Sequence, residues 1–264
     1  MPELSTTIDE VITALEQIIS ESIRTNSRNG YFAALYLKVT ESVKQGIQRK
    51  QFEDGQRMER LDVLFANRYL EAYHQWKSGQ EPSASWKLAF ETAEKRSPLI
   101  LQHLLLGMSA HINLDLGIAT VEETGDTPLE DIHNDFDMIN TIISSLTYQV
   151  LSDLGRVSPL LSLLGLHAGN NNSVLIQFSI DNARDGAWCF AEELYEKAAS
   201  ERPQVIEERD KTILRLGESI VGQSGFLKFT AWLVHLFEWK TPAKVINVLR
   251  GQKKQHFTVG KTLA

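Results

Sequence analysis

The sequence predicts an all-α protein that folds as a single-domain bundle of many helices. Apolar residues recur every three or four positions along most of the 264 residues, which is the spacing of one helical face. No run alternates apolar and polar residues between hairpin turns, so we expect no strands. Neither a repeat nor a linker divides the sequence, and we therefore expect one domain over residues 1–264.

Three helices are expected in the first 80 residues. A helix within residues 1–28 follows the capping residue types of Ser5–Thr7. The turn sequence NSRNG separates it from a second helix over residues 31–49. A third helix is expected over residues 56–77, because Ser78–Gly79 provides a stop.

The middle of the chain predicts three more helices. A fourth helix is expected over residues 83–94. Pro98 is favourable in a first helical turn, and it opens a fifth helix that we expect to reach about Thr120. The turn sequence TGDTPLEDIH then places a second proline at the start of a sixth helix over residues 128–154.

The C-terminal part of the chain continues the helical pattern. Residues 157–172 predict a short apolar helix followed by a polar loop, and residues 251–264 predict a flexible tail. The helices expected between these segments cover residues 175–199, 205–216, 226–239 and 242–249.

The composition argues against several kinds of partner. The formal net charge is −7, so no basic face would offset repulsion from nucleic-acid phosphates. No run approaches about 18 uninterrupted apolar residues, and we expect no membrane-spanning helix. The acidic N-terminus lacks the basic and apolar regions of a secretory signal, which predicts a cytoplasmic protein.

The single cysteine, Cys189, excludes an intrachain disulfide and a cysteine-based zinc cluster. It stands between Trp188 and Phe190 in a helical run, where we expect a buried, unreactive thiol. The sequence motifs of serine hydrolases, P-loop enzymes, dinucleotide-binding enzymes and H-E-x-x-H metalloproteases do not occur.

The fifth helix carries the strongest candidate site. His103, His111 and Asp115 interrupt an otherwise apolar segment, where ionisable side chains are costly unless they are paired or ligated. His111 and Asp115 are four residues apart, a spacing that lets two side chains on one face bind one metal ion. Imidazole and carboxylate ligands suit zinc, manganese or iron. Asp115 is either such a ligand or the carboxylate that orients His111.

Three other helices offer polar groups. Glu59 and Asp62 lie in an otherwise apolar third helix, where they either anchor helix ends by hydrogen bonds or belong to a site. Asp137 shares a polar stripe of the sixth helix with His133 and is a further candidate ligand. Arg184, in the expected seventh helix, either pairs with neighbouring aspartates or, if buried, binds an anionic substrate.

Several segments resemble an uncharacterised bacterial family of unknown function. They are MERLDVLFANRYLEAYHQWKSG, QHLLLGMSAHINLDLGIA, DFDMIN, ARDGAW and PAKVINVL. The order and spacing of unusual polar residues inside apolar helices carry the resemblance, which covers most of the chain from about Tyr31 onward. The resemblance implies an all-helical, soluble protein and brings no established activity.

Two functional hypotheses follow from these residues. The first is a hydrolase that depends on a divalent metal ion (zinc, manganese or iron). Its metal ligands would be His103, His111, Asp115 and Asp137. Glu59 or Asp62 would accept a proton from metal-bound water, and Arg184 would bind the substrate. The second is a non-catalytic protein whose buried polar residues form a structural network or a pocket for a small molecule. The hydrolase hypothesis requires the polar stripes of the third, fifth and sixth helices to meet at a cavity.

Overall fold

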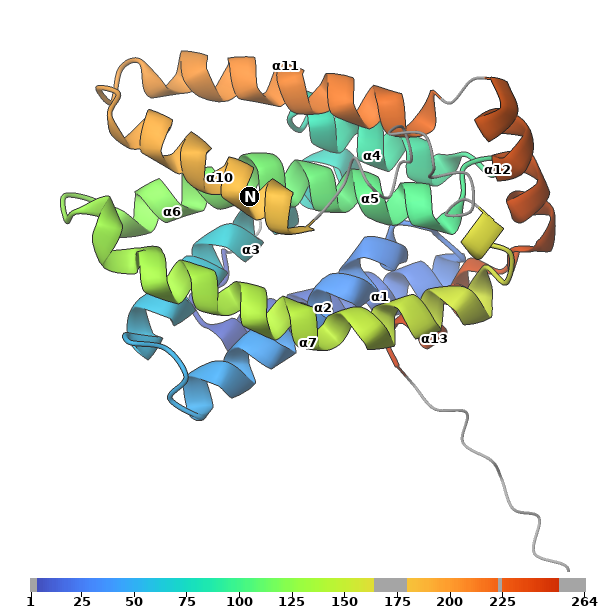
Figure 1. Cartoon of the computed structure of the whole chain (residues 1–264), viewed down its shortest axis with the longest axis horizontal. Helices are drawn as coiled ribbons and strands as arrows, with labels where there is room; N and C mark the ends of the chain where they lie inside the picture. Colours follow the sequence, from blue (N-terminus) through green and yellow to red (C-terminus); the bar gives the residue numbers. More distant parts are fainter. Residues whose placement is uncertain (1–3, 164–179, 223–224, 252–264) are drawn as a thin grey trace, which may run out of the picture.

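The computed structural model describes residues 4–163, 180–222 and 225–251. Within these ranges every regular element is helical, with eleven α-helices and no strand, and the helices pack into one body (Figure 1). The prediction of an all-α bundle is therefore confirmed.

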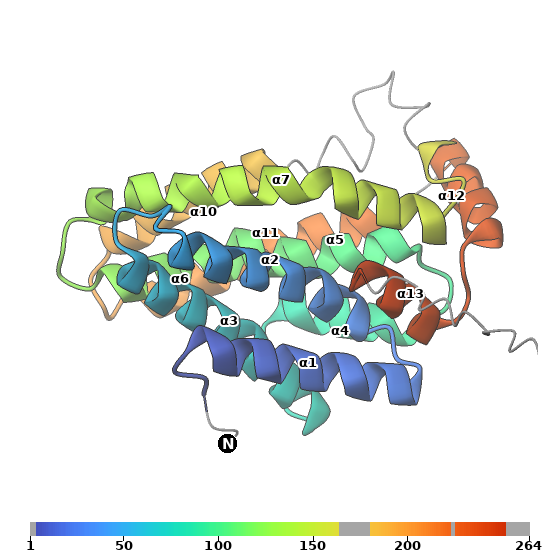
Figure 2. The same cartoon turned by 90° about the horizontal axis from the view of Figure 1, so that it is seen from below.

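The first three helices lie close to their predicted positions. They are α1 (Ile8–Thr25), α2 (Gly30–Gln48) and α3 (Gly55–Lys77). The side chain of Thr7 accepts a hydrogen bond from the N–H of Glu10, and Asp54 accepts two from the first turn of α3. Such caps satisfy N–H groups that have no partner inside the helix. α1 packs along α2 (Figure 2).

A long helical rod runs through the centre of the molecule. It consists of α5 (Ile100–Ala110), the π-helical segment η1 (His111–Asp115) and α6 (Leu116–Thr124). α5 packs against α2, α4 (Ala84–Glu94) and α11 (Arg202–Val221). α6 packs against α3 and α10 (Ile180–Tyr195). The fifth helix was predicted as one continuous helix, and the π-helical turn inside it was not foreseen.

The rod Ile100–Thr124 is long and apolar enough to cross a membrane by length and composition alone. However, 89% of its most apolar 18-residue stretch is buried inside the protein. Packing against the surrounding helices therefore accounts for its apolar sequence.

The remaining helices complete the bundle. The short 3-10 helix η2 (Leu129–Ile132) leads into α7 (His133–Val157), which packs against α2 and α13 (Pro242–Leu249). The others are α10 (Ile180–Tyr195), α11 (Arg202–Val221), α12 (Gly225–Phe237) and α13 (Pro242–Leu249). α11 is longer at both ends than predicted, and most of the predicted loop over residues 157–172 lies outside the described residues.

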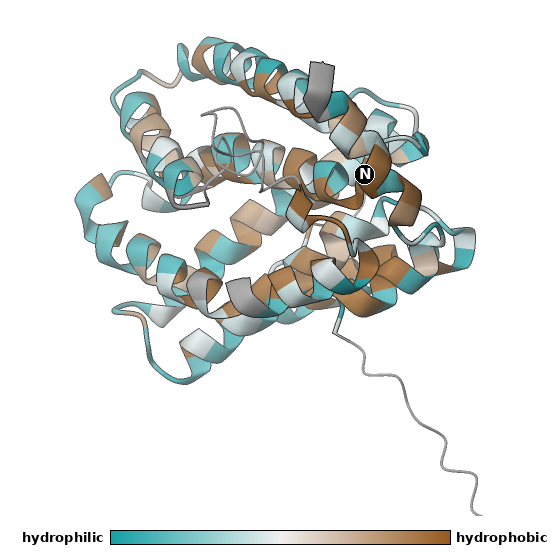
Figure 3. Cartoon of the chain, turned by 45° about the vertical axis from the view of Figure 1, so that its right-hand side comes forward, coloured by the Kyte–Doolittle hydropathy of each residue, from teal (hydrophilic) through white to brown (hydrophobic). Residues whose placement is uncertain are grey.

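Apolar side chains form two adjoining clusters in the interior. One contains Phe32 and Trp86, and the other contains Phe136 and Phe190. Many helices are hydrophilic on one side and apolar on the other (Figure 3). Residues from both clusters form the walls of the cavity described below.

The prediction of a buried Cys189 is wrong, because the thiol residue is exposed. The inner face of α10 is formed by Ala187, Phe190, Ala191 and Leu194. At about 100° per residue, Cys189 falls on the opposite side of the helix. An apolar neighbour on each side in the sequence therefore did not indicate burial.

Candidate functional site

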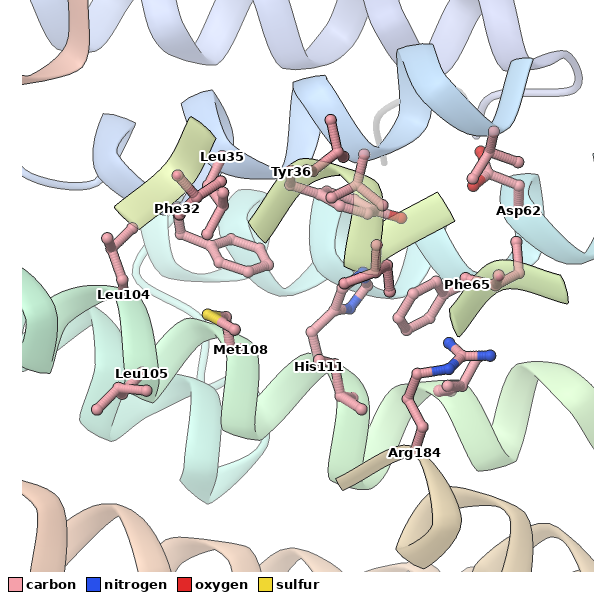
Figure 4. A pocket seen from close by; sticks show the side chains of 18 of the residues that line it. Phe32, Leu35, Tyr36, Asp62, Phe65, Leu104, Leu105, Met108, His111 and Arg184 are labelled. Carbon is pink, nitrogen blue, oxygen red and sulfur yellow. The ribbon is translucent and has the colours of Figure 1, made fainter. Parts of the chain in front are cut away.

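A cavity of about 250 Å³ lies between α2, α3, the central rod, α7 and α10 (Figure 4). Leu, Ile, Val, Met and Phe side chains make up most of its walls. The exceptions are Tyr36, Asp62, His111 and Arg184. The site is therefore an apolar chamber with a small number of polar groups at defined positions.

The cavity is elongated along the bundle. Its lining residues on the rod run from Leu101 to Leu116, and those on α7 run from Phe136 to Leu154. At 1.5 Å per residue these stretches span roughly 22 Å and 27 Å. A volume of about 250 Å³ distributed over that length describes a narrow channel.

His111 stands at the middle of this channel, in the π-helical turn. Its ring stacks on Phe65 with 3.6 Å between ring centroids, and Tyr36 contacts it edge-on at 4.5 Å. In Figure 4 these three side chains lie together in the centre of the view. A π-helical turn changes the direction of the side chains within a helix, and such turns are frequent at functional sites.

Asp115 fixes the orientation of the imidazole. His111 Nδ1 lies 3.1 Å from Asp115 Oδ2, which also accepts a hydrogen bond of 2.9 Å from Trp86 Nε1. Arg68 Nε donates to the other oxygen, Oδ1, at 3.2 Å. Both oxygens of Asp115 are thus engaged, and of the two alternatives for this residue the geometry favours the orienting carboxylate.

These contacts determine which nitrogen of His111 carries the proton. Because the Asp115 carboxylate accepts a hydrogen bond, Nδ1 is the N–H donor and Nε2 keeps its lone pair. Burial lowers the pKa of His111, against the opposing effect of Asp115, so the ring is neutral at neutral pH. Nε2 is buried and has no hydrogen-bond partner among the described residues.

Besides His111, two more residues of the channel, Asp62 and Tyr36, have a polar atom without a hydrogen-bond partner among the described residues. Asp62 is 7% exposed, and its Oδ2 has no hydrogen-bond partner within the described residues. Burial raises the pKa of this carboxyl group to about 7, and the nearby Glu59 adds to the rise. Glu59 itself faces the start of α1, where its Oε1 lies 3.4 Å from the N–H of Ile8. The two acids of the third helix therefore have different roles, one as an anchor and one in the cavity.

Arg184 enters the same cavity from α10. It is 3% exposed, and its Nη2 donates a hydrogen bond of 2.5 Å to the carbonyl of Phe136. The guanidinium also lies 4.4 Å from the centroid of the Phe136 ring. Arg184 thus ties α10 to α7 at one end of the channel.

The predicted metal ligands are dispersed. His103 lies on the rod two turns before His111 and lines a different cavity. The side chain of Asp137 is 58% exposed, and its nearest described ion-pair partner is His133 at 3.7 Å. Across the described part of the chain, no three His, Cys, Asp or Glu side chains form a group that could hold a metal ion. The polar stripes of the third and fifth helices do meet at the cavity, whereas Asp137 of the sixth helix points away from it.

Sequence reasoning missed four residues of this site. Phe65, Tyr36 and Trp86 resemble ordinary core aromatics in the sequence, and Arg68 resembles a solvent-exposed arginine. One signal in the sequence could have identified Arg68. A buried carboxylate such as Asp115 requires hydrogen-bond donors, and an arginine in an otherwise apolar helix is a suitable donor.

The fold and the cavity together define an all-helical protein with an internal apolar channel and few polar groups. Residues 8–223 match the model of a family of unknown function, DUF5995, and the chain belongs to this family. The resemblance seen in the sequence is thereby confirmed, although the match begins earlier than Tyr31 and ends before PAKVINVL. No curated protein and no solved structure matches the chain.

Proposed function

We propose that this protein binds a small, elongated and mainly apolar molecule that carries one hydroxyl group, inside the channel between the rod and α7. One observation carries the proposal: three residues that line this apolar cavity, His111, Asp62 and Tyr36, each have a buried polar atom with no hydrogen-bond partner among the described residues. The non-catalytic hypothesis with a small-molecule pocket is the one that this geometry supports.

The volume of the channel limits the ligand. An engineered apolar cavity of about 150 Å³ holds benzene, and pockets for drug-sized ligands begin at about 300 Å³. At about 250 Å³ the channel suits a molecule between these sizes. Its narrow, extended form favours an unbranched hydrocarbon chain over a ring system.

The polar atoms specify the head group. A buried acceptor without a hydrogen bond costs about 1–3 kcal/mol, which a ligand hydroxyl would recover. His111 Nε2 is an acceptor, so it requires a donor from the ligand. Asp62 accepts when ionised and donates when protonated, and a hydroxyl group can pair with either form.

Thermal unfolding with 1-decanol and decane tests this proposal. We expect 1-decanol to raise the melting temperature at lower concentration than decane, because only the alcohol offers a hydroxyl group. His111→Phe keeps the ring stacked on Phe65 and removes the acceptor, so it should weaken alcohol binding by about fivefold and leave decane binding unchanged.

Met108→Trp fills the channel and should abolish binding of both compounds. The matched control is Leu236→Trp, because Leu236 is exposed on α12 outside the cavity. Circular dichroism verifies that each variant keeps its helical content. Equal binding by wild type and Met108→Trp, or no binding by wild type, would show that the channel is not a ligand site.

A further inference from the structure

A second cavity, of about 410 Å³, lies at one end of the bundle. The turn between α1 and α2, the start of α5 and the connection from α12 to α13 enclose it. It shares no lining residue with the apolar channel. Its walls are mainly polar, in contrast to those of the channel.

Three cationic side chains line this cavity: Arg28, Arg96 and Lys240. Nothing in the described part of the chain forms an ion pair with any of them. Arg28 Nη1 reaches the carbonyl of Ala93 at 3.5 Å, and Lys240 Nζ donates to the carbonyl of His235. Neutral carbonyls do not balance these positive charges, so the cavity attracts anions.

A buried histidine in the same cavity has no hydrogen-bond partner within the described ranges. His103 is 7% exposed, and neither of its ring nitrogens forms a hydrogen bond within the described residues. Burial lowers the pKa of His103 to about 3, with Arg28 and His235 acting in the same direction. The ring is therefore neutral and has one N–H available as a donor. A buried donor without a partner is costly unless a ligand or water satisfies it.

One carboxylate, Glu238, also lines the cavity, but its oxygens face the protein. It accepts hydrogen bonds from Ser158 Oγ at 2.8 Å and from the N–H of Ile100, at the start of α5, at 3.2 Å. Its other oxygen lies 3.5 Å from His235 Nδ1. Burial raises the pKa of Glu238 to about 7, which reduces its negative charge near neutral pH. Glu238 therefore offsets at most one of the three cations.

We propose that this cavity binds a small anionic molecule through a phosphoryl or carboxylate group, which Arg28, Arg96 and Lys240 neutralise while His103 donates a hydrogen bond. The site lies beyond the proposed function, because it differs from the channel in place and in chemistry. Arginine pairs with either type of oxyanion through parallel N–H donors. The volume leaves room for a molecule larger than the oxyanion alone.

Calorimetric titration with inorganic phosphate and with malonate, at ionic strength held constant with sodium chloride, tests the site. We expect saturable binding of at least one probe by the wild-type protein. Binding of phosphate alone assigns a phosphoryl group to the ligand, and binding of malonate alone assigns a carboxylate. Binding of neither probe would overturn the proposal.

Arg96→Gln removes one cation at an exposed position and should weaken binding by about tenfold, because a charge-assisted hydrogen bond is lost. His103→Phe keeps the ring shape, removes the donor and should weaken binding by a smaller factor. Arg24→Gln is the matched control, since Arg24 is exposed on α1 and does not line the cavity. An equal loss in Arg24→Gln and Arg96→Gln would overturn the proposal, because it would show nonspecific attraction. Binding of 1-decanol should stay unchanged in Arg96→Gln, which separates this test from that of the channel.

Discussion

Asp115 is the residue on which the polar arrangement around the channel depends. Three donors from three different helical segments converge on its carboxylate: Trp86 from α4, Arg68 from α3 and His111 from η1. A buried carboxylate is tolerated only when such donors compensate for the loss of water. The same contacts fix the imidazole tautomer, so the position of the acceptor in the channel follows from the environment of Asp115.

Replacement of Asp115 should therefore destabilise the fold. In Asp115→Asn the amide nitrogen cannot accept a hydrogen bond, and Arg68 loses its buried counter-charge. We expect the free energy of unfolding to fall by about 2–4 kcal/mol, measured by urea denaturation. Asp137→Asn is the control, because this exposed aspartate should change stability by less than about 0.5 kcal/mol. Equal effects of the two substitutions would contradict this account of Asp115.

Asp62 gives a prediction about pH. The pKa of its carboxyl group is about 7 in the folded protein, against an ordinary value of 3.8. The folded state therefore holds a proton that the unfolded chain releases above about pH 4. This stabilising contribution is complete below the unfolded pKa and is lost as pH rises through the folded pKa.

Asp62→Asn removes this titration. From pH 4 to pH 8 the stability of the variant relative to wild type should increase by roughly 2–4 kcal/mol, from the size of the pKa shift. His103, whose pKa is lowered, makes stability rise with pH, and Glu238, whose pKa is raised, makes it fall. Both effects are the same in wild type and variant, so they cancel in the difference between the two. Denaturation at several pH values measures the difference. A difference that does not change with pH would mean that the folded carboxyl group titrates normally.

At the scale of the helix, the sequence pattern predicted the elements well and their irregularities poorly. Capping residues and the 3.6-residue period indicated α1 to α4 within a few residues, because these signals are local. The π-helical turn at His111–Asp115 was missed, since its side chains keep a spacing that also fits an α-helix. This turn matters for the site, because it contains His111, which lines the channel.

Close contact between helices makes a prediction at this scale. A Cβ atom added to Gly117 of α6 would lie 2.6 Å from Phe190 and 3.0 Å from the carbonyl oxygen of Ala187, both on α10. Gly117→Ala should therefore reduce stability by about 1–3 kcal/mol, since the backbone of α10 would have to move.

Gly155 is the matched control for Gly117. It lies inside α7, and an added Cβ would meet nothing within 4 Å. Gly155→Ala should increase stability by about 0.5–1 kcal/mol, because alanine loses less backbone entropy in a helix. Thermal denaturation of the two variants measures both effects. Stabilisation by Gly117→Ala would show that α6 and α10 do not pack as closely as described.

At the scale of the whole molecule, the arrangement of the helices decides where ligands can bind. α7 packs against α2 and α13, and the channel separates much of it from the rod. Arg184 connects α10 to α7 at one end of that channel. At the end of the bundle, segments far apart in the sequence bring Arg28, Arg96 and Lys240 to one cavity. Both proposed sites are products of this packing.

The sequence by itself determined the helical class, most helix positions, the family and the presence of ionisable residues in buried helices. Tertiary structure alone decided that Arg68 and Trp86 hold Asp115, that Glu59 and Asp62 separate, and that His103 and His111 serve different cavities. The physical reason is the distance along the chain over which each interaction acts. Helix periodicity and capping depend on neighbours within four residues, whereas partners across helices depend on how side-chain volumes fill the space between them.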